Sequence, residues 1–340
     1  MYFKRDSKLN YIGSKSRLSS WIKDEVVKVV GSDLSQKVFC DMFAGTGIVG
    51  RTFKKDVKKV IANDLEHYSF VLNKNYIENH EEIDDKEKYI EELNKLPLID
   101  NGFVYKNYCI GSGSGRQYFS DDNGKKIDTI RTKIQEWSDS GKISGALYYF
   151  LLASLLESAD KVANTASVYE AFLKTIKPPA LKELRLSSAN FILNDNSHEV
   201  FNEDSNELIK KVSGDILYLD PPYNHRQYGS KYHILNTITR YEDFTPKGKT
   251  GLPDYNRSDY SAKRKVHDSF NELIANAKFK YIFLSYNNEG LMSESDVKNI
   301  MQKYGKYSLV KKEYKRFKVQ MHKNTKDNKT FEYLHILEKL

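Results

Sequence analysis

An apolar run leads directly into a glycine-rich turn in the sequence Val38-Phe39-Cys40-Asp41-Met42-Phe43-Ala44-Gly45-Thr46-Gly47-Ile48-Val49-Gly50. This order predicts a strand, a tight turn and a helix, because glycines at a strand end let the backbone approach a nucleotide-like ligand closely. A second apolar run, Val57 to Ala62, ends at Asn63-Asp64, and a helix is predicted from Glu66 to about Asn79. Strands that alternate with helices at this spacing predict a doubly wound, mostly parallel, Rossmann-like α/β sheet.

Two classes of cofactor are compatible with this turn. Gly45, Gly47 and Gly50, with acidic Asp64 downstream, match the loose dinucleotide fingerprint, so a nicotinamide-dependent oxidoreductase has to be weighed. An Asp at the strand end with Phe-Ala before the first glycine is instead the pattern of S-adenosylmethionine binders. Asp64 suits a ribose diol in either case. We therefore expect S-adenosylmethionine to contact Asp41, Phe43, Gly45, Gly47 and Asp64.

The strongest chemical signal comes after a later strand. Leu217-Tyr218-Leu219 is apolar, and Asp220-Pro221-Pro222-Tyr223-Asn224 comes at its carboxyl end, where α/β sheets place their active sites. Two consecutive prolines lack N–H donors and restrict φ, so the strand stops and the loop is stiff. A rigid carboxylate therefore stands beside an outward-pointing carbonyl and an aromatic ring.

This combination suits methylation of the amino group of adenine, a poor nucleophile because its lone pair is delocalised into the ring. Hydrogen bonds from the NH₂ group to the Asp220 carboxylate and the Pro221 carbonyl would localise that lone pair. The nitrogen could then attack a sulfonium methyl group in line. Tyr223 would stack on the extruded base, because a base inside the duplex cannot reach such a pocket. We predict a catalytic centre of Asp220, Pro221, Pro222 and Tyr223.

With its extension Asn224-His225-Arg226-Gln227-Tyr228, the motif resembles that of the α-group of amino-DNA methyltransferases, the group of the Dam enzymes. It more closely resembles the adenine methyltransferases of restriction-modification systems, and the resemblance covers most of the chain. It implies a site-specific enzyme that transfers a methyl group from S-adenosylmethionine to adenine N6 in duplex DNA after base flipping. It further implies cofactor contacts by Tyr11 and Lys15 with the methionine part, by Asn194-Asp195 with the adenine, and by Asp220 beside the sulfonium.

The α/β pattern is interrupted between about Leu96 and Gly145. A glycine- and serine-rich stretch, Gly111 to Gly115, precedes Arg116-Gln117, and a charged amphipathic helix is predicted at about Ile127 to Trp137. We assign residues 1–95 and 160–340 to the catalytic domain and residues 96–159 to an inserted DNA-recognition region. Base readout is expected chiefly from this insertion, where Arg116 and Gln117 can make bidentate base contacts and Arg131 and Lys133 lie on the helix that follows. The basic loop Pro246 to Lys265 is expected to contact phosphates and to contribute to readout. DNA contacts are also predicted for Asn224, Arg226, Tyr228, Lys231, Lys249 and Arg257.

The remaining elements are predicted from apolar patterning. Helices are expected at Ser14–Val30, Ile143–Glu157 and Ala166–Thr175, and strands at Asn190–Leu193, Asp215–Leu219 and Lys280–Ser285. The chain should close with an antiparallel hairpin of Tyr307–Met321 and Phe331–Glu338.

Composition sets further expectations. The net charge is +8, and residues 301–340 hold 11 Lys and Arg against 4 Asp and Glu, which suits a polyanion partner or equally a solvated basic face. Cys40 and Cys109 are too few for a disulfide framework or a structural zinc site, and no run approaches the ~18 apolar residues of a membrane span. We expect a cytoplasmic monomer without a metal or a membrane partner. It should bind double-stranded DNA, with a cognate restriction endonuclease acting independently of it.

Two alternatives stay open at this point. Ser in place of Asp220 would favour cytosine N4, but the Asp/Ser distinction is not absolute, so a cytosine-N4 DNA methyltransferase is one alternative. A non-catalytic DNA-binding protein on a methyltransferase fold is the other, although the intact glycines and Asp64 argue against it. We reject a P-loop at Gly248-Lys249-Thr250, because position 243 is Asp and no apolar strand precedes it.

Overall fold

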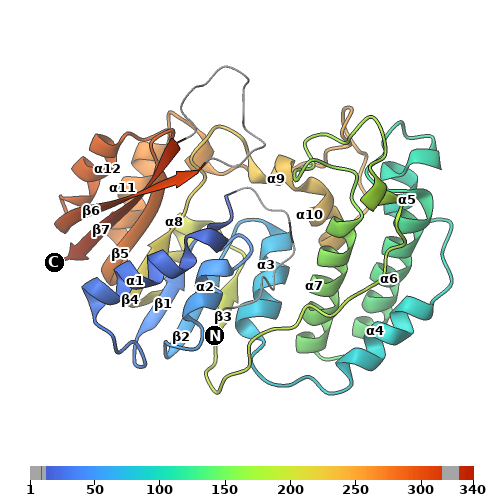
Figure 1. The fold of residues 1–340 in the computed structure, drawn as a ribbon, viewed down its shortest axis with the longest axis horizontal. Helices are drawn as coiled ribbons and strands as arrows, with labels where there is room; N and C mark the ends of the chain where they lie inside the picture. The colour runs from blue at the N-terminus through green and yellow to red at the C-terminus, as the bar shows by residue number, and fades with distance from the viewer. Residues whose placement is uncertain (1–8, 10–12, 316–328) are drawn as a thin grey trace. The chain divides into compact units, whose positions relative to one another are not determined.

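The computed structural model describes residue 9, residues 13–315 and residues 329–340. The chain divides into two compact units, each assembled from separate stretches (Figure 1). The sheet unit comprises Lys15–Leu65, Asn196–Gln227 and Arg257–Leu340, and the helical unit comprises Met1–Ser14, Glu66–Asp195 and Tyr228–Asn256. The chain therefore enters the helical unit just after Asp64, and again just after the Asp220 motif.

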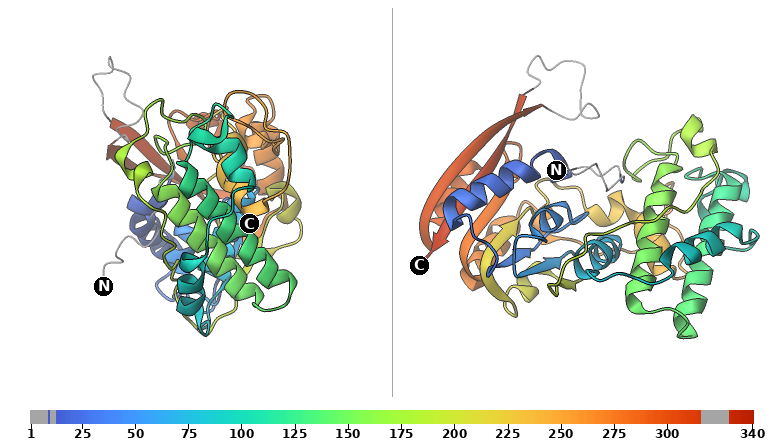
Figure 2. Two further views of the ribbon diagram at one scale, coloured as in Figure 1. Left: turned by 90° about the vertical axis from the view of Figure 1, so that its right-hand side faces the viewer. Right: turned by 60° about the horizontal axis from the view of Figure 1, so that its bottom comes forward.

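A single sheet of seven strands forms the centre of the sheet unit in the part of the chain that is described, in the order β3-β2-β1-β4-β5-β7-β6. The strands are β1 Val38–Asp41, β2 Lys59–Asn63, β3 Glu199–Phe201, β4 Ser213–Leu219, β5 Lys278–Asn287, β6 Gly305–Lys315 and β7 Lys329–Lys339. Strands β1 to β5 pair in parallel, whereas β7 is antiparallel to both β5 and β6. The predicted doubly wound sheet with an antiparallel C-terminal hairpin is confirmed, and β6 forms one edge of the sheet (Figure 2).

Alternate side chains along the strands face opposite layers of the sheet unit. Phe39 of β1 stacks on Phe53 of helix α2 (Ile48–Phe53), with ring centroids 4.1 Å apart. The next residue, Cys40, belongs to the apolar cluster that contains Leu217 and, from α11, Phe270. The helices of this unit are η1 Lys15–Arg17, α1 Ser19–Val30, α2 Ile48–Phe53, α8 Ser205–Leu208, η5 Asp259–Ser261, α11 Val266–Asn276 and α12 Glu294–Met301.

The helical unit has an apolar core of its own. Tyr68, Ile130, Leu155 and Leu235 are fully buried in it, and its long helices α6 and α7 lie side by side (Figure 2). Its helices are α3 His67–Asn73, the π-helical turn η2 Lys74–Glu78, α4 Lys86–Lys95, α5 Phe103–Tyr108, η3 Ile110–Ser112, α6 Asp121–Asp139, α7 Gly145–Lys161, η4 Pro178–Leu181, α9 Tyr228–Lys231 and α10 His233–Arg240. None of the helices in the described ranges combines the length and apolarity needed to cross a membrane.

Most predicted elements are confirmed, and two are wrong. Residues 166–175 form no helix, because side chains hold this segment in an irregular path; Asn164 Nδ2 donates a 3.0 Å hydrogen bond to the Leu173 carbonyl. Residues 190–193 form no strand, and the strand that pairs with β2 is β3, several residues later. The three apolar residues Phe191-Ile192-Leu193 are too short a run for periodicity to identify a strand. The predicted hairpin residues 316–321 lie outside the described residues.

The predicted insertion, residues 96–159, lies within the helical unit, which extends beyond it on both sides and includes Tyr228–Asn256. The helical unit thus contains the insertion and residues 246–256 of the basic loop, the two segments to which DNA contacts were assigned, whereas residues 257–265 of that loop belong to the sheet unit. That these segments recognise DNA stays a prediction.

Candidate active site

The predicted site residues of the sheet unit lie at the ends of neighbouring strands. Asp41 ends β1 and pairs in register with Ala62 of β2 and Tyr218 of β4, so Asp64 and Asp220 emerge close to it at the same edge of the sheet. Carboxyl ends of parallel strands meet at one edge, where open α/β sheets bind ligands. The sheet therefore brings the glycine turn, Asp64 and the Asp220 motif together.

Two carboxylates brace the glycine turn. The Gly45 amide donates a 2.8 Å hydrogen bond to Asp64 Oδ2, and the Gly50 amide donates a 3.0 Å bond to Asp41 Oδ2. Gly45 and Gly47 have φ values of 52° and 73°, in the left-handed region that glycine adopts readily. The turn is therefore held in a defined shape by the two strands beside it.

Asp41 is an unusual buried acid. Burial raises the pKa of Asp41 to about 8, and the negative charges of Asp220 and Asp64 act in the same direction. Its Oδ1 atom is buried and has no hydrogen-bond partner among the described residues. A buried acceptor without a partner beside other carboxylates suits a ligand that carries hydrogen-bond donors and positive charge. S-adenosylmethionine, with its ammonium and sulfonium groups, has this character.

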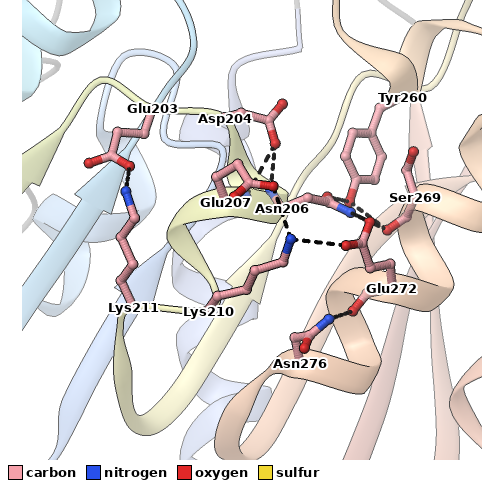
Figure 3. Close-up of polar contacts among 10 residues, drawn as sticks. All are labelled: Glu203, Asp204, Asn206, Glu207, Lys210, Lys211, Tyr260, Ser269, Glu272 and Asn276. Atoms are coloured by element: carbon pink, nitrogen blue, oxygen red, sulfur yellow. Dashed lines mark hydrogen bonds and ion pairs between the residues drawn. The ribbon is translucent and has the colours of Figure 1, made fainter.

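An aromatic wall lies beside the glycine turn. The half-buried Phe43 ring meets the Tyr260 ring edge-on, with centroids 4.9 Å apart. The Tyr260 ring is fixed at its hydroxyl, which donates a 2.8 Å hydrogen bond to Asn206 Oδ1. Asn206 in turn donates to the Ser269 carbonyl and to Glu272, which ties α8 to α11 (Figure 3).

The Asp220 motif continues directly from β4. The Asp220 side chain is 18% exposed, and its Oδ1 lies 3.0 Å from Lys15 Nζ. Burial raises the pKa of Asp220 to about 6, against the opposing effect of Lys15. Pro221 is buried, and Pro222 and Tyr223 are half-buried. The Tyr223 carbonyl accepts a 3.0 Å hydrogen bond from the Leu291 amide, which anchors the end of the motif.

Lys15 belongs to a buried group of charges, and the cofactor contact that the resemblance implied for it stays a prediction. Its buried ammonium lies between Asp220 and Glu332 of β7, 3.1 Å from Glu332 Oε1, rather than standing alone as a ligand group. Sequence reasoning missed Glu332. A signal was available, since a carboxylate alternates with Leu334 and Ile336 on a buried strand face. Tyr11, the other residue of that motif, lies outside the described residues.

The contact of Asp195 with the cofactor adenine stays a prediction. Asp195 is exposed, and the next residue, Asn196, donates a 3.1 Å hydrogen bond to the Val57 carbonyl, before the start of β2. The amino ends of parallel strands lie at the edge opposite to the glycine turn. The residue that reaches Asp64 from the end of β3 is instead Asn202, whose Nδ2 donates a 2.7 Å hydrogen bond to the Asp64 carbonyl.

The residues predicted to contact DNA are divided between the units. Asn224, Arg226 and Arg257 belong to the sheet unit, where Asn224 Oδ1 accepts a 3.0 Å hydrogen bond from the Arg226 amide. In the helical unit, Tyr228 stacks on Tyr232, and the buried Lys231 places its Nζ 4.6 Å from the centre of the Tyr228 ring. A buried lysine is a poor candidate for a phosphate contact. Lys249 is exposed.

Arg116 and Gln117 hold neighbouring loops. Arg116 donates hydrogen bonds to the carbonyls of Asn107, Gly248 and Lys249, at 3.2, 3.0 and 3.3 Å. Gln117 Nε2 donates 2.6 Å bonds to the carbonyls of Leu173 and Lys174. Arg131, on the amphipathic helix predicted at about Ile127 to Trp137, is buried and donates to the carbonyls of Ile238 and Thr239 at the end of α10. These donors are engaged with the backbone rather than presented to a base.

The turn Lys247–Leu252 is clamped from inside the helical unit. The carbonyls of Gly248 and Lys249 accept hydrogen bonds from Arg116. The Thr250 carbonyl lies 3.0 Å from His233 Nε2, and the Gly251 carbonyl accepts a 2.7 Å hydrogen bond from the Tyr108 hydroxyl. A Cβ at Gly251 would lie 2.7 Å from Arg116 Nε, so only glycine leaves room for the clamp. These hydrogen bonds hold the carbonyls of the turn, Lys249 has an exposed side chain, and Lys247 Nζ lies 2.7 Å from Asp254 Oδ1.

Comparisons with known proteins agree with these features. The family described as D12 class N6 adenine-specific DNA methyltransferase matches residues 11–300. The chain is 59% identical over 333 residues to the Type II methyltransferase M.NlaIII of Neisseria lactamica, covering 97% of this chain and 99% of that protein. It is 37% identical to the Type II methyltransferase M.CviAII of Paramecium bursaria Chlorella virus 1, over 93% of this chain and 94% of that protein. It is also 37% identical to the Type II methyltransferase M.FokI of Planomicrobium okeanokoites, over 97% of this chain and 53% of that protein.

Proposed function

The chain belongs to the D12 class of N6 adenine-specific DNA methyltransferases, and we propose that it methylates adenine within one short DNA sequence, with S-adenosylmethionine as the donor. A DNA adenine methyltransferase requires a methyl donor of this type and DNA as its substrate. The observation that carries the proposal is the meeting of the glycine turn, Asp64 and the Asp220 motif at one edge of the sheet unit. The relatives' description as Type II methyltransferases supports a role as the modification enzyme of a restriction-modification system. We expect a monomer that acts independently of any cognate endonuclease.

The cofactor would be held by the braced turn. When bound, S-adenosylmethionine supplies an electrophilic methyl group on a sulfonium. Asp64 accepts hydrogen bonds from the ribose hydroxyls while keeping the Gly45 amide in place. The unpartnered Oδ1 of Asp41 accepts a donor of the cofactor, and Phe43 provides an apolar wall. Glycine at positions 45 and 47 allows the close approach that a side chain would prevent.

The target amine would be held by the Asp220 motif. One oxygen of Asp220 faces Lys15, and the second accepts a hydrogen bond from the adenine NH₂ group, with the Pro221 carbonyl as the other acceptor. These acceptors localise the nitrogen lone pair and aim it at the methyl group, so catalysis rests on positioning and electrostatics. Tyr223 stacks on the base after it has left the duplex.

DNA would be engaged by the helical unit together with the residues after the catalytic motif. Lys249 on the clamped turn is suited to a phosphate, because its side chain is exposed and Arg116 and His233 hold the carbonyls of the turn, whereas Lys247 is paired with Asp254. Arg116 and Gln117 contribute by fixing the loops that they hold, instead of reading bases directly. Asn224, Arg226 and Arg257 supply polar and basic groups on the sheet unit.

Sequencing of single DNA molecules tests the function directly. A plasmid expressing the protein in a host that lacks DNA methylation should carry N6-methyladenine in one recurring sequence, and the plasmid of an Asp220→Ala variant should carry none. N4-methylcytosine in place of methyladenine, or an unmodified wild-type plasmid, would refute the proposal. Transfer of tritium from labelled S-adenosylmethionine to the same DNA establishes the donor.

A further inference from the structure

A buried group of charges lies behind the catalytic carboxylate in the sheet unit. Lys15 Nζ is 3.0 Å from Asp220 Oδ1 and 3.1 Å from Glu332 Oε1. The side chains of Lys15 and Glu332 are each only 8% exposed, compared with 18% for Asp220. Ion pairs that exclude water in this way are weakly screened by salt and hold a fixed geometry.

Glu332 is itself fixed from the far side. Ser285 of β5 donates a 2.6 Å hydrogen bond to Glu332 Oε1, the same oxygen that faces Lys15. The backbone positions Glu332 independently, because β7 pairs with β5 and places Glu332 opposite Asn287. Lys15 therefore lies between a hydrogen-bonded carboxylate on β7 and the Asp220 carboxylate after β4.

The pairing of Lys15 with two carboxylates affects the chemistry at Asp220. A lysine that paired with Asp220 alone would be free to approach both carboxylate oxygens and to compete with the adenine amine for them. Because Glu332 draws the ammonium to one side, Lys15 engages Asp220 Oδ1, and no contact of Oδ2 is found among the described residues. The carboxylate thereby keeps an acceptor for the amine while it remains charge-paired.

We propose that Glu332 is a positioning residue for methyl transfer: through Lys15 it orients the Asp220 carboxylate and leaves one of its oxygens to the adenine amine. The inference rests on the proposed role of Asp220. Glu332 contacts neither the base nor the cofactor in this mechanism, and it acts through Lys15. The C-terminal hairpin accordingly serves the active site as well as the edge of the sheet.

The arrangement also predicts how the reaction responds to pH. Asp220 is faced by Lys15 from η1, Glu332 from β7, Tyr218 from β4 and Asp41 from β1. The pKa of Asp220 is raised to about 6, chiefly by burial; the charge of Glu332 acts in the same direction and that of Lys15 opposes it. The amine needs an ionised acceptor, so the rate should fall as the pH drops through the pKa of Asp220.

Two variants should shift the acid limb of the pH–rate profile, the pH range over which the rate falls, in opposite directions. In Glu332→Gln a negative charge near Asp220 is lost, so the pKa of Asp220 falls and the limb moves to lower pH. Lys15 then pairs with Asp220 alone. The rate at pH values above the acid limb, the plateau rate, should therefore fall by roughly tenfold or more, the scale of a misplaced reacting group. In Lys15→Met the compensating charge is lost, so the limb moves to higher pH. The measurement is single-turnover transfer of labelled methyl groups, with saturating DNA and cofactor, between pH 5 and 9.

A matched control and a double variant complete the test. Glu338→Gln removes the same charge from the same strand, where the carboxylate is 44% exposed and lies near Lys280, and its pH profile should match that of the wild type. The double variant Lys15→Met/Glu332→Gln should restore the acid limb toward the wild-type position, because the two charge changes oppose each other. The plateau losses of the single variants should not add in it.

The inference is overturned if the pH profile of Glu332→Gln superimposes on that of the wild type, or if its rate falls equally at every pH together with a lowered melting temperature. Asp220→Ala separates this result from failure of the proposed function. If Asp220→Ala remains active, the catalytic role of Asp220 is wrong and the positioning role falls with it. If Asp220→Ala is inactive while Glu332→Gln behaves like the wild type, only the role of Glu332 is refuted.

Discussion

The backbone amide of Gly45 donates a 2.8 Å hydrogen bond to Oδ2 of Asp64, which joins the turn after β1 to the end of β2. The carboxylate expected to bind the ribose therefore also holds the loop that surrounds the cofactor. Loop shape and cofactor affinity should depend on the same side chain.

Replacing Asp64 should weaken cofactor binding. Asp64→Ala removes the ribose contact and the brace on Gly45, so affinity for S-adenosylmethionine should fall by ~1.5–3 kcal/mol, the usual scale for hydrogen bonds to a charged group. Asp64→Asn should lose less, because its amide oxygen can still accept from Gly45. Calorimetric titration measures both, with exposed Asp33→Ala as the control. Unchanged affinity in Asp64→Ala would contradict the placement of the ribose.

Replacing Asp220 should abolish methyl transfer. Asp220→Ala removes an acceptor that activates the target amine, and the loss of one preorganised electrostatic contact typically costs ~10²–10³ in rate. Asp220→Asn keeps one acceptor oxygen but no charge, so its rate should lie between those of the alanine variant and the wild type. Single-turnover assays at saturating cofactor separate this effect from weaker binding. An alanine variant with more than a tenth of wild-type activity would refute the assigned role.

Lys249 should contribute to DNA affinity without reading sequence. Lys249→Ala should weaken binding to specific and scrambled duplexes alike and reduce the salt slope by about one, as expected for the loss of a phosphate contact. Binding titrations over a series of salt concentrations measure this. Lys88, an exposed lysine on α4, provides the matched control, and Lys88→Ala should bind as the wild type does. A loss confined to the specific duplex would mean that Lys249 reads a base.

Arg116 should act through the clamped turn. Arg116→Ala releases the carbonyls of Gly248 and Lys249, so the turn should become mobile and DNA affinity should fall. Once the turn is loose, removing Lys249 as well should cost little more, and the double variant should be less than additive. Strict additivity would show that the two residues act independently. Loss of sequence discrimination in the Arg116 single variant, by ~1–3 kcal/mol, would then favour direct base readout.

Buried histidines should make folding sensitive to mild acid. Burial lowers the pKa of His67, His233 and His335 to about 4, below the ordinary value of 6.5. The unfolded chain therefore takes up these protons first, and folding stability should decrease as the pH falls from about 6.5 toward 4. Thermal unfolding at a series of pH values measures the effect, and His335→Gln should flatten the dependence. Asp41 and Asp220, whose pKa values are raised, act in the opposite direction, so the comparison with the variant decides: a His335→Gln variant with the same pH dependence as the wild type would contradict this assignment.

The glycine turn and the Asp220 motif could be predicted from the sequence because they are local. The run Val38–Asp41 before the glycines, and the prolines after Leu219, show within a few residues where each strand stops and which kind of turn comes next. Parallel pairing then brings the ends of those strands to one edge, so the catalytic and cofactor residues could be expected near one another without knowledge of the structure.

Tertiary structure alone decided the partners of these residues. Glu332 reaches Lys15 and Asp220 because β7 pairs with β5, and nothing near Asp220 in the sequence indicates that pairing. Arg116 was expected at a base, but Asn107 and the turn at Gly248 bring carbonyls to its guanidinium. An arginine side chain can donate hydrogen bonds either to a DNA base or to backbone carbonyls. The Gly248 carbonyl lies 132 positions from Arg116 along the chain, so that contact forms only when the helical unit has folded.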